Sequence, residues 1–295
     1  MNILPVSLLA LLPLSLSFSA NAQDQTPSAA TEAPIGVPTA EKLGWQVGVH
    51  AYTFKEFSIF EAIDKTKALG LKYMSISGSV SLDGKTRLST SALTDADLNA
   101  IHQKCRENGI TLLNMGVVQL PADEAKSRAV FEFAKKLGID TLVAEPAPEA
   151  LDTVDKLCQE YNIRVAIHNH PKPSHYWNPD TVLEAIKGRS PLLGACADTG
   201  HWIRSGLEPL DCVKKLEGHI FAFHFKDLAE RDPHTHDVPW GNGVGNIKGV
   251  LQEMQRQKFK GAFLVEYEYH WTTSSPEIAE GVKYFEATCR ELTAK

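Results

Sequence analysis

KLGIDTLVAE (136–145) and EYNIRVAIHN (160–169) show one repeated pattern: an amphipathic helix ends at Gly or Asn, and an apolar run follows at once. The same pattern recurs in ALGLKYMSIS (68–77), ENGITLLNMG (107–116), LEGHIFAFHF (216–225) and KFKGAFLVEY (258–267). Gly and Asn tolerate the left-handed backbone that stops a helix. Each stretch therefore predicts the passage from a helix into a buried strand.

Two more apolar runs, WQVGVHAYTF (45–54) and PLLGACAD (191–198), bring the predicted strands to eight. Helical periodicity lies between them, over 56–69, 94–108, 122–137, 149–161, 179–187, 207–217, 246–257 and 276–293. Roughly 31 residues per unit is the size of a βα repeat, and runs without alternation suit strands buried on both faces. The pattern predicts a single-domain (β/α)8 TIM barrel. A doubly wound open sheet is the alternative, although no glycine-rich loop follows the first strand.

The overall composition is that of a globular protein. The 295 residues are 43% hydrophobic and 22% charged, with a net charge of −6. A negative chain is a poor general binder of nucleic acid, so we expect no such partner. The five cysteines form no CxxC motif. Four fall on predicted helices and Cys196 on a predicted strand, and we interpret all five as packed free thiols.

The N-terminal region is expected to lie outside the barrel. Residues 1–22 combine an apolar run with the small-residue sequence Ala20-Asn21-Ala22, which predicts a signal peptide cleaved near Ala22. An uncleaved membrane anchor is the alternative. Residues 23–44 are predicted to be a flexible lead and 45–295 the barrel. No second long apolar run exists, so the mature protein is expected to be secreted or periplasmic, without a stable membrane span. The sequence leaves open whether the protein forms a homo-oligomer.

Ionisable side chains follow the apolar runs at five adjacent predicted strands. They are Glu145, then His168 and His170, then Asp198 and His201, then His224 and Lys226, and finally Glu266 and Glu268. Chemistry in such barrels sits at the carboxyl ends of the strands. A satisfied buried polar group is the alternative for any one of them, but carboxylates packed together would repel each other unless a cation held them.

Four of these residues are predicted to bind one divalent metal ion: His168, Asp198, His224 and Glu266. Two imidazoles and two carboxylates favour Mn²⁺, with Co²⁺, Fe²⁺, Zn²⁺ or Mg²⁺ as alternatives. Glu145 is the expected general base, with His170 and His201 as alternatives.

Aromatic side chains near the same strand ends suggest a sugar ligand, because a pyranose has an apolar face and a hydroxyl edge. The long segment 231–245 is interpreted as a substrate lid; packing of surface loops is the alternative. The expected substrate contacts are Tyr52, Asn169, Trp177, Trp202, Lys226, His236, Asp237, Trp240 and Glu268.

These motifs resemble the xylose isomerase-like TIM-barrel superfamily, in particular its sugar isomerase/epimerase group. The matching pieces are VAEP (143–146), IHNH (167–170), DTGHW (198–202), HFKD (224–227), VPWGNG (238–243) and VEYE (265–268). The resemblance places Asp198, His224 and Glu266 on metal positions and His201 on a substrate-contact position. In one departure, His168 stands where many epimerases of the group carry Glu.

The resemblance implies a metal-dependent sugar isomerase or epimerase that abstracts the proton next to a carbonyl through an enediolate. Because His168 replaces a Glu that serves as both ligand and acid/base, Glu145 or a His is left to move the proton. The first alternative is a lyase or hydratase that eliminates the aglycone from 3-keto-glycosides. The second is a non-catalytic secreted barrel that binds sugars.

Overall fold

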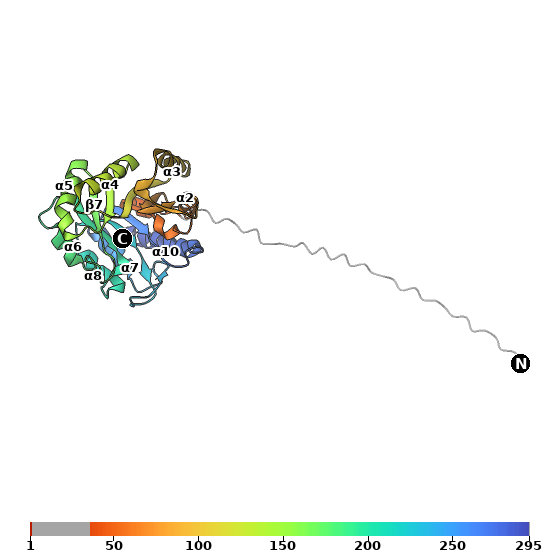
Figure 1. Cartoon of the computed structure of the whole chain (residues 1–295). Coiled ribbons are helices and arrows are strands. Elements are labelled where there is room, and N and C mark those ends of the chain that lie inside the picture. The colour runs from red at the N-terminus through yellow and green to blue at the C-terminus, as the bar shows by residue number, and fades with distance from the viewer. Residues whose placement is uncertain (2–35, 295) are drawn as a thin grey trace. The chain divides into compact units, whose positions relative to one another are not determined.

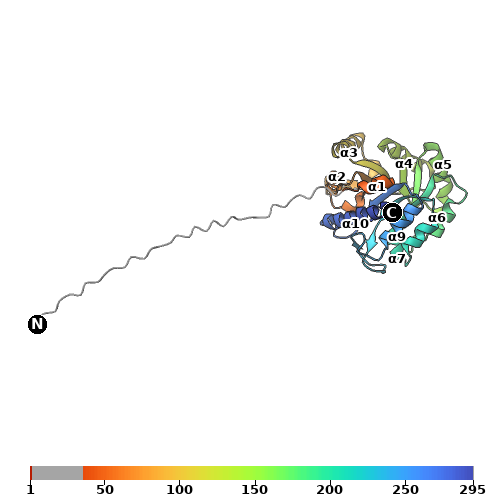
Figure 2. The ribbon, with the colours of Figure 1, turned by 180° about the vertical axis from the view of Figure 1, so that it is seen from behind.

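A computed structural model of the chain describes residue 1 and residues 36–294. Eight parallel strands close a barrel in the order β1-β12-β9-β8-β7-β6-β5-β2, and helices surround it in two opposite views (Figures 1 and 2). The strands are β1 (Trp45–His50), β2 (Tyr73–Ser77), β5 (Thr111–Val118), β6 (Thr141–Ala144), β7 (Arg164–His168), β8 (Leu193–Asp198), β9 (Ile220–Phe225) and β12 (Gly261–Val265). The predicted (β/α)8 barrel is confirmed.

The outer helices are α2 (Ile59–Ala68), α3 (Asp95–Asn108), α4 (Glu124–Leu137), α5 (Leu151–Tyr161), α6 (Pro179–Ile186), α8 (Pro209–Lys215), α9 (Ile247–Arg256) and α10 (Ser275–Thr293). Local chemistry sets their ends. The Thr94 side chain accepts a hydrogen bond from the Asp97 amide at the start of α3, which satisfies a free backbone donor of the first turn. Gly138 ends α4 at a φ of 76°, the left-handed conformation that glycine adopts without strain.

Alternation along the strands positions the site. Val143, Ala166, Cys196, Ala222, Ala262 and Leu264 form one buried cluster from neighbouring strands. Successive strand side chains point to opposite faces, so residues two positions apart share a direction. The residue two positions after Ala166 is His168, and the same step leads from Cys196 to Asp198 and from Ala222 to His224. Small apolar residues thus lie below the polar residues at the carboxyl ends of the strands.

Several elements depart from the repeated pattern. Helix α1 (Pro38–Leu43) lies within the segment expected to be a flexible lead. It is ordered because Ala40 is buried and because Glu286 of α10 accepts hydrogen bonds from the Thr39 amide and hydroxyl. The short helix α7 (Thr199–Arg204) follows β8 directly. The expected signal peptide lies outside the described residues.

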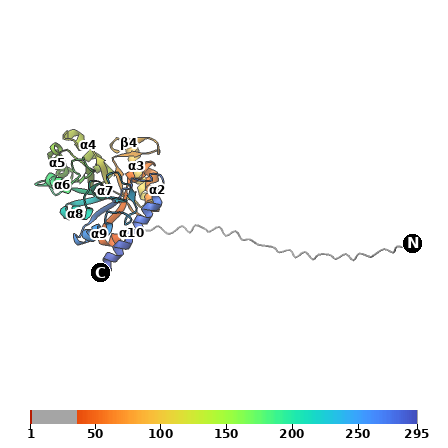
Figure 3. The same cartoon turned by 90° about the horizontal axis from the view of Figure 1, so that it is seen from below.

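Two antiparallel hairpins also extend the barrel. They pair β3 (Ser79–Ser81) with β4 (Arg87–Ser89), and β10 (Asp227–Leu228) with β11 (Asp237–Val238). The β4 hairpin lies far from the C-terminal end of α10 (Figure 3). Each hairpin follows the carboxyl end of a barrel strand, so both belong to the side of the barrel on which the polar residues gather.

All five cysteines are buried and free, which confirms their interpretation as packed thiols. Burial raises the pKa of Cys105 to about 11 and that of Cys158 to about 12, because a thiolate loses hydration inside the protein. No helix within the described residues has the length and apolarity needed to cross a bilayer.

Candidate metal centre and substrate cavity

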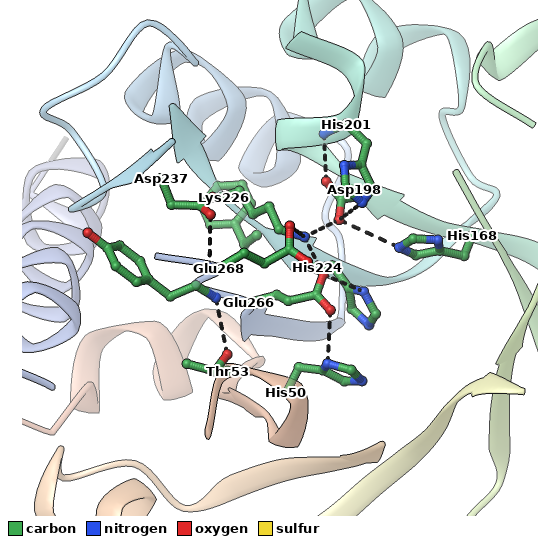
Figure 4. A network of polar contacts seen from close by, with 12 residues as sticks. His50, Thr53, His168, Asp198, His201, His224, Lys226, Asp237, Glu266 and Glu268 are labelled. Carbon is green, nitrogen blue, oxygen red and sulfur yellow. Dashed lines mark hydrogen bonds and ion pairs between the residues drawn. The ribbon is translucent and has the colours of Figure 1, made fainter. Parts of the chain in front are cut away.

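The structure brings together the four side chains expected to bind a metal. They come from neighbouring strands: His168 and Asp198 end β7 and β8, His224 is the last residue but one of β9, and Glu266 follows β12. One ligand atom from each lies within 4.8 Å of the others. All four residues are buried. Figure 4 shows them converging on one region. Their convergence follows from parallel strands of matched register, in which Asp198 lies beside His224 and His224 beside Leu264.

The donor set fits a divalent ion. The Nε2 atom of His224 is buried without a hydrogen-bond partner in the structure, while His224 Nδ1 lies 3.1 Å from Glu266 Oε2 and His168 Nε2 lies 3.5 Å from Asp198 Oδ2. Buried polar atoms are normally satisfied, so His224 Nε2 is available to bind another group, and the two nitrogens beside carboxylates could share an ion with them. The carboxylates of Asp198 and Glu266 supply oxygen donors beside them. This mixed set suits first-row divalent metals better than Ca²⁺.

Lys226 lies within the same cluster, fully buried. Its Nζ is 2.5 Å from Asp198 Oδ2 and also donates to Glu266 Oε2. Burial alone would lower the pKa of Lys226, but the two carboxylates raise it well above its ordinary value. The sequence places Lys226 among the substrate contacts, whereas the structure pairs it with two candidate metal ligands and leaves it outside the cavity lining.

Glu145 organises two imidazoles. Its Oε1 lies 3.0 Å from His168 Nδ1 and also contacts His170 Nδ1 and the His170 amide, while Oε2 accepts from the Ser174 hydroxyl. Burial opposes ionisation, but the hydrogen bonds from both histidines hold the pKa of Glu145 well below its usual range. A carboxylate can only accept, so both Nδ1 atoms carry the proton. This leaves the Nε2 lone pair of His170 available. Burial would lower the pKa of His168, but the Asp198 and Glu145 carboxylates raise it to about 9, so its Nε2, 3.5 Å from Asp198 Oδ2, carries a proton that a metal ion would have to displace.

His50, at the end of β1, belongs to the centre although sequence reasoning missed it. Its Nε2 lies 2.9 Å from the Gly116 carbonyl oxygen, and its Nδ1 lies 3.0 Å from Glu266 Oε1. Because a carbonyl oxygen only accepts, Nε2 must donate. The available signal was positional: His50 ends an apolar run just as His168 and His224 do.

A cavity of about 410 Å³ opens beside these residues. His170, His201 and Glu268 line one part of it, and Tyr52 and Ser79 another. His201 is buried, its amide donates to Asp198 Oδ1 at 2.7 Å, and its Nδ1 lies 3.3 Å from Arg204 Nη1. Because Arg204 only donates, His201 Nδ1 accepts and Nε2 carries the proton.

Other expected substrate contacts have structural partners. Asn169 ties β7 to β8 through the amide and carbonyl of Asp198. Trp240 is buried and donates from Nε1 to the Phe225 carbonyl. Trp202 is also buried, whereas Trp177 stacks with the Lys172 ammonium at 3.9 Å. None of these residues lines the cavity, because their polar groups or rings pack against the protein.

The segment expected to be a lid is fixed at its base. Asp227 accepts hydrogen bonds from the amides of Gly241, Gly243 and Gly245. Asp237 is buried in β11 and accepts from the Glu268 amide, while His236 is exposed and packs on Tyr269. Neither Asp237 nor His236 lines the cavity.

The sequence profile of the family described as "Xylose isomerase-like TIM barrel" matches residues 63–288. The chain therefore belongs to this family. No curated protein sequence matches the chain.

Solved structures share the fold. A putative uncharacterized protein from Parabacteroides distasonis is 32% identical, with a TM-score of 0.66 over 83% of this chain and 99% of that chain. A D-tagatose 3-epimerase-like protein is 18% identical, with a TM-score of 0.65 over 84% and 98%. The probable 3-DHS dehydratase AsbF from Bacillus anthracis is 15% identical, with a TM-score of 0.62 over 80% and 97%.

Proposed function

We propose that the protein is a divalent-metal-dependent isomerase or epimerase that abstracts the proton next to the carbonyl of a keto-sugar or sugar derivative. The observation that carries this proposal is the group His168, Asp198, His224 and Glu266 beside a polar cavity. Support also comes from the sugar-processing proteins that share the fold. An ion held there, Mn²⁺ in our proposal, would polarise a carbonyl and make the neighbouring C–H more acidic.

The protein's own groups supply the proton transfer. His170 lines the cavity, and its Nε2 lone pair faces away from the hydrogen bond that Nδ1 makes with Glu145. We assign the general base to His170 Nε2, oriented by the Glu145 carboxylate. His201 carries its proton on Nε2 and donates to a substrate oxygen. Glu145 therefore acts through His170 in this proposal and does not remove the substrate proton itself.

One observation favours elimination as a second candidate. The candidate metal ligand on β7 is His168, and its Nδ1 is hydrogen-bonded to Glu145. This residue therefore provides no second base on the opposite side of the cavity. A single base suits isomerisation, or loss of a group from the carbon next to the carbanion. The alternative function is therefore a metal-dependent lyase or hydratase that releases the aglycone from 3-keto-glycosides.

Solvent deuterium tests the proposal. The protein with Mn²⁺ is incubated in D₂O with free ketoses and with methyl 3-keto-β-D-glucoside, and products are followed by NMR. Deuterium next to the carbonyl with retained carbon connectivity supports isomerisation or epimerisation, whereas released methanol supports the lyase. EDTA should abolish either reaction. Binding of sugar without deuterium incorporation at any metal loading would instead support the non-catalytic sugar-binding barrel.

The proposal includes export of the mature protein after cleavage near Ala22. Expression of the full chain with N-terminal sequencing of the extracytoplasmic product tests this part separately. A product that begins at Gln23 supports it, and a protein that retains its first residues in the membrane fraction supports the anchor.

A further inference from the structure

A second cavity of about 370 Å³ adjoins the first, and the two share Tyr52 in their linings. Three cations line it: Lys55, which follows the η1 turn (Ala51–Phe54), and Lys85 and Arg87 of the β3–β4 hairpin. Glu56 is the carboxylate in this lining.

These cations have no carboxylate partner among the described residues, unlike the paired lysines elsewhere on the surface. Lys72 and Lys104 lie 2.8 Å from Glu41 and 2.7 Å from Asp64. By contrast, among the described residues no carboxylate lies within ion-pair distance of Lys55, Lys85 or Arg87. In a chain whose net charge is −6, three unneutralised cations around one cavity form a local field that attracts anions.

Two of the three cations, Arg87 and Lys55, are held in place by uncharged groups. Arg87 donates to the carbonyl of Lys55 at 2.8 Å and to the carbonyl of Ser79, which joins the hairpin to the η1 turn. The Lys55 ammonium lies 3.6 Å from the centre of the Trp271 ring and 3.4 Å from the Tyr52 hydroxyl. The positive charge is therefore positioned next to two aromatic rings.

The hairpin tip is shaped by its own carboxylate. Asp83 accepts from the Ser81 hydroxyl and from the amides of Lys85 and Thr86. These bonds occupy Asp83 Oδ1 with the backbone of the turn, and the Lys85 side chain stays exposed.

We propose that this second cavity is a subsite for a negatively charged unit attached to the sugar that reacts in the first cavity. It rests on the proposed function, since it assigns the non-reacting part of the same substrate. The class of substrate is a glycoside whose second unit carries a carboxylate or another anionic group. The aromatic rings of Tyr52 and Trp271 contact the apolar faces of this unit, and the lysines attract its charge.

A matched pair of ligands tests the charge preference. Binding of p-carboxyphenyl β-D-glucoside and its uncharged isostere p-carbamoylphenyl β-D-glucoside is measured by calorimetry with Mn²⁺-loaded protein. The Arg87 guanidinium already donates to two carbonyl oxygens, so we assign the preference to the two lysines, which predict about tenfold tighter binding of the carboxylate at low salt. The preference should shrink as salt screens the charges. Equal affinities for the two ligands would overturn the proposal.

Variants locate the effect. Lys85→Met and Lys55→Met should each reduce the preference, and the double variant should abolish it. Glu56→Gln should increase it, because the variant loses the repulsive charge that Glu56 contributes among the described residues of the lining. Lys67→Met, an exposed lysine outside both cavities, is the control and should change nothing. A preference that survives in the double variant would place the anion elsewhere and refute the assignment.

Turnover separates this inference from the proposed function. Methyl 3-keto-β-D-glucoside occupies the first cavity alone, and Lys85→Met should process it like the wild type. Turnover of this substrate without any charge preference in the aryl pair would refute the subsite and leave the proposed function standing. No binding or turnover of any of these sugars would refute both.

Discussion

Replacing Lys226 with methionine removes one charge from the candidate metal centre while keeping a side chain of similar length. In the wild type, the Lys226 ammonium lies 2.5 Å from Asp198 Oδ2, donates to Glu266 Oε2 and lies 3.9 Å from Glu268 Oε2. The variant leaves Asp198 and Glu266 buried without this cation. We expect it to be less stable without metal and to bind a divalent ion more tightly.

Both effects have a magnitude that follows from the geometry. Breaking a buried ion pair by removing one partner costs about 3–5 kcal/mol, and roughly 2–4 °C of Tm accompanies each kcal/mol in a domain of this size. The Tm in EDTA should therefore fall by roughly 10 °C. Two unit charges 4 Å apart repel by about 4 kcal/mol at an effective dielectric constant of 20. Losing the ammonium should then strengthen divalent binding by at least about tenfold, which is 1.4 kcal/mol.

The assay uses Co²⁺, whose visible absorption reports the ligands directly. Protein freed of metal with EDTA is titrated with Co²⁺, and Tm is measured by thermal shift with EDTA and with excess Mn²⁺. The variant should recover most of its lost Tm when the ion is present. Lys215→Met is the matched control, because this lysine pairs with Asp180 on the surface and should change neither quantity.

The reasoning is refuted if Lys226→Met binds Co²⁺ no more tightly than the wild type, or if its Tm in EDTA is unchanged. The first result would mean that the ion and the ammonium do not share the carboxylates. The second would mean that the buried pair contributes nothing to folding.

Three further predictions concern other groups. Glu145→Gln should weaken Co²⁺ binding by about 10–100-fold, because a neutral amide oxygen accepts the His168 Nδ1 hydrogen bond without the charge that makes the imidazole a stronger ligand; unchanged Co²⁺ titrations would contradict this role. Burial raises the pKa of Asp237 from 3.8 to about 7. Between these pH values the native state therefore binds more protons than the unfolded state, so the free energy of unfolding of the wild type falls as the pH rises from about 4 to about 7. In urea unfolding, Asp237→Asn should remove up to about 4 kcal/mol of this fall in the free energy of unfolding. If the variant and the wild type lose stability equally with pH, the prediction is wrong. DTNB should react slowly with all five thiols of the native protein and rapidly after denaturation; fast native reaction would contradict their burial.

The sequence was sufficient to predict the repeated units and the convergence of His168, Asp198, His224 and Glu266. The carboxyl ends of the strands of a closed parallel barrel meet at one rim. Polar residues that follow the apolar runs in the sequence are therefore mostly neighbours in space. The same logic did not separate roles. Lys226 and Glu268 each lie two positions after a candidate metal ligand in the sequence, and only the structure shows that Glu268 lines the cavity whereas Lys226 does not.

His50 and Glu145 show where local pattern stops being informative. Nothing in the first apolar run reveals that His50 Nδ1 reaches Glu266, since these residues are more than 200 positions apart in the sequence. The sequence gives no sign of partners for Glu145, whereas in the structure two imidazoles and one hydroxyl form hydrogen bonds with its carboxylate. Tryptophans near strand ends were likewise ambiguous, because packing and sugar stacking demand the same residue type.

Asp227 closes the base of a long loop with three glycine amides, and this has a consequence for protein engineering. The residues between β10 and β11 can be exchanged as a unit, because the bonds that fix both ends of the loop come from the strand pair and from Asp227. Libraries randomised over residues 230–236 should therefore yield mostly folded proteins, whereas libraries that include Gly241, Gly243 or Gly245 should yield mostly insoluble ones.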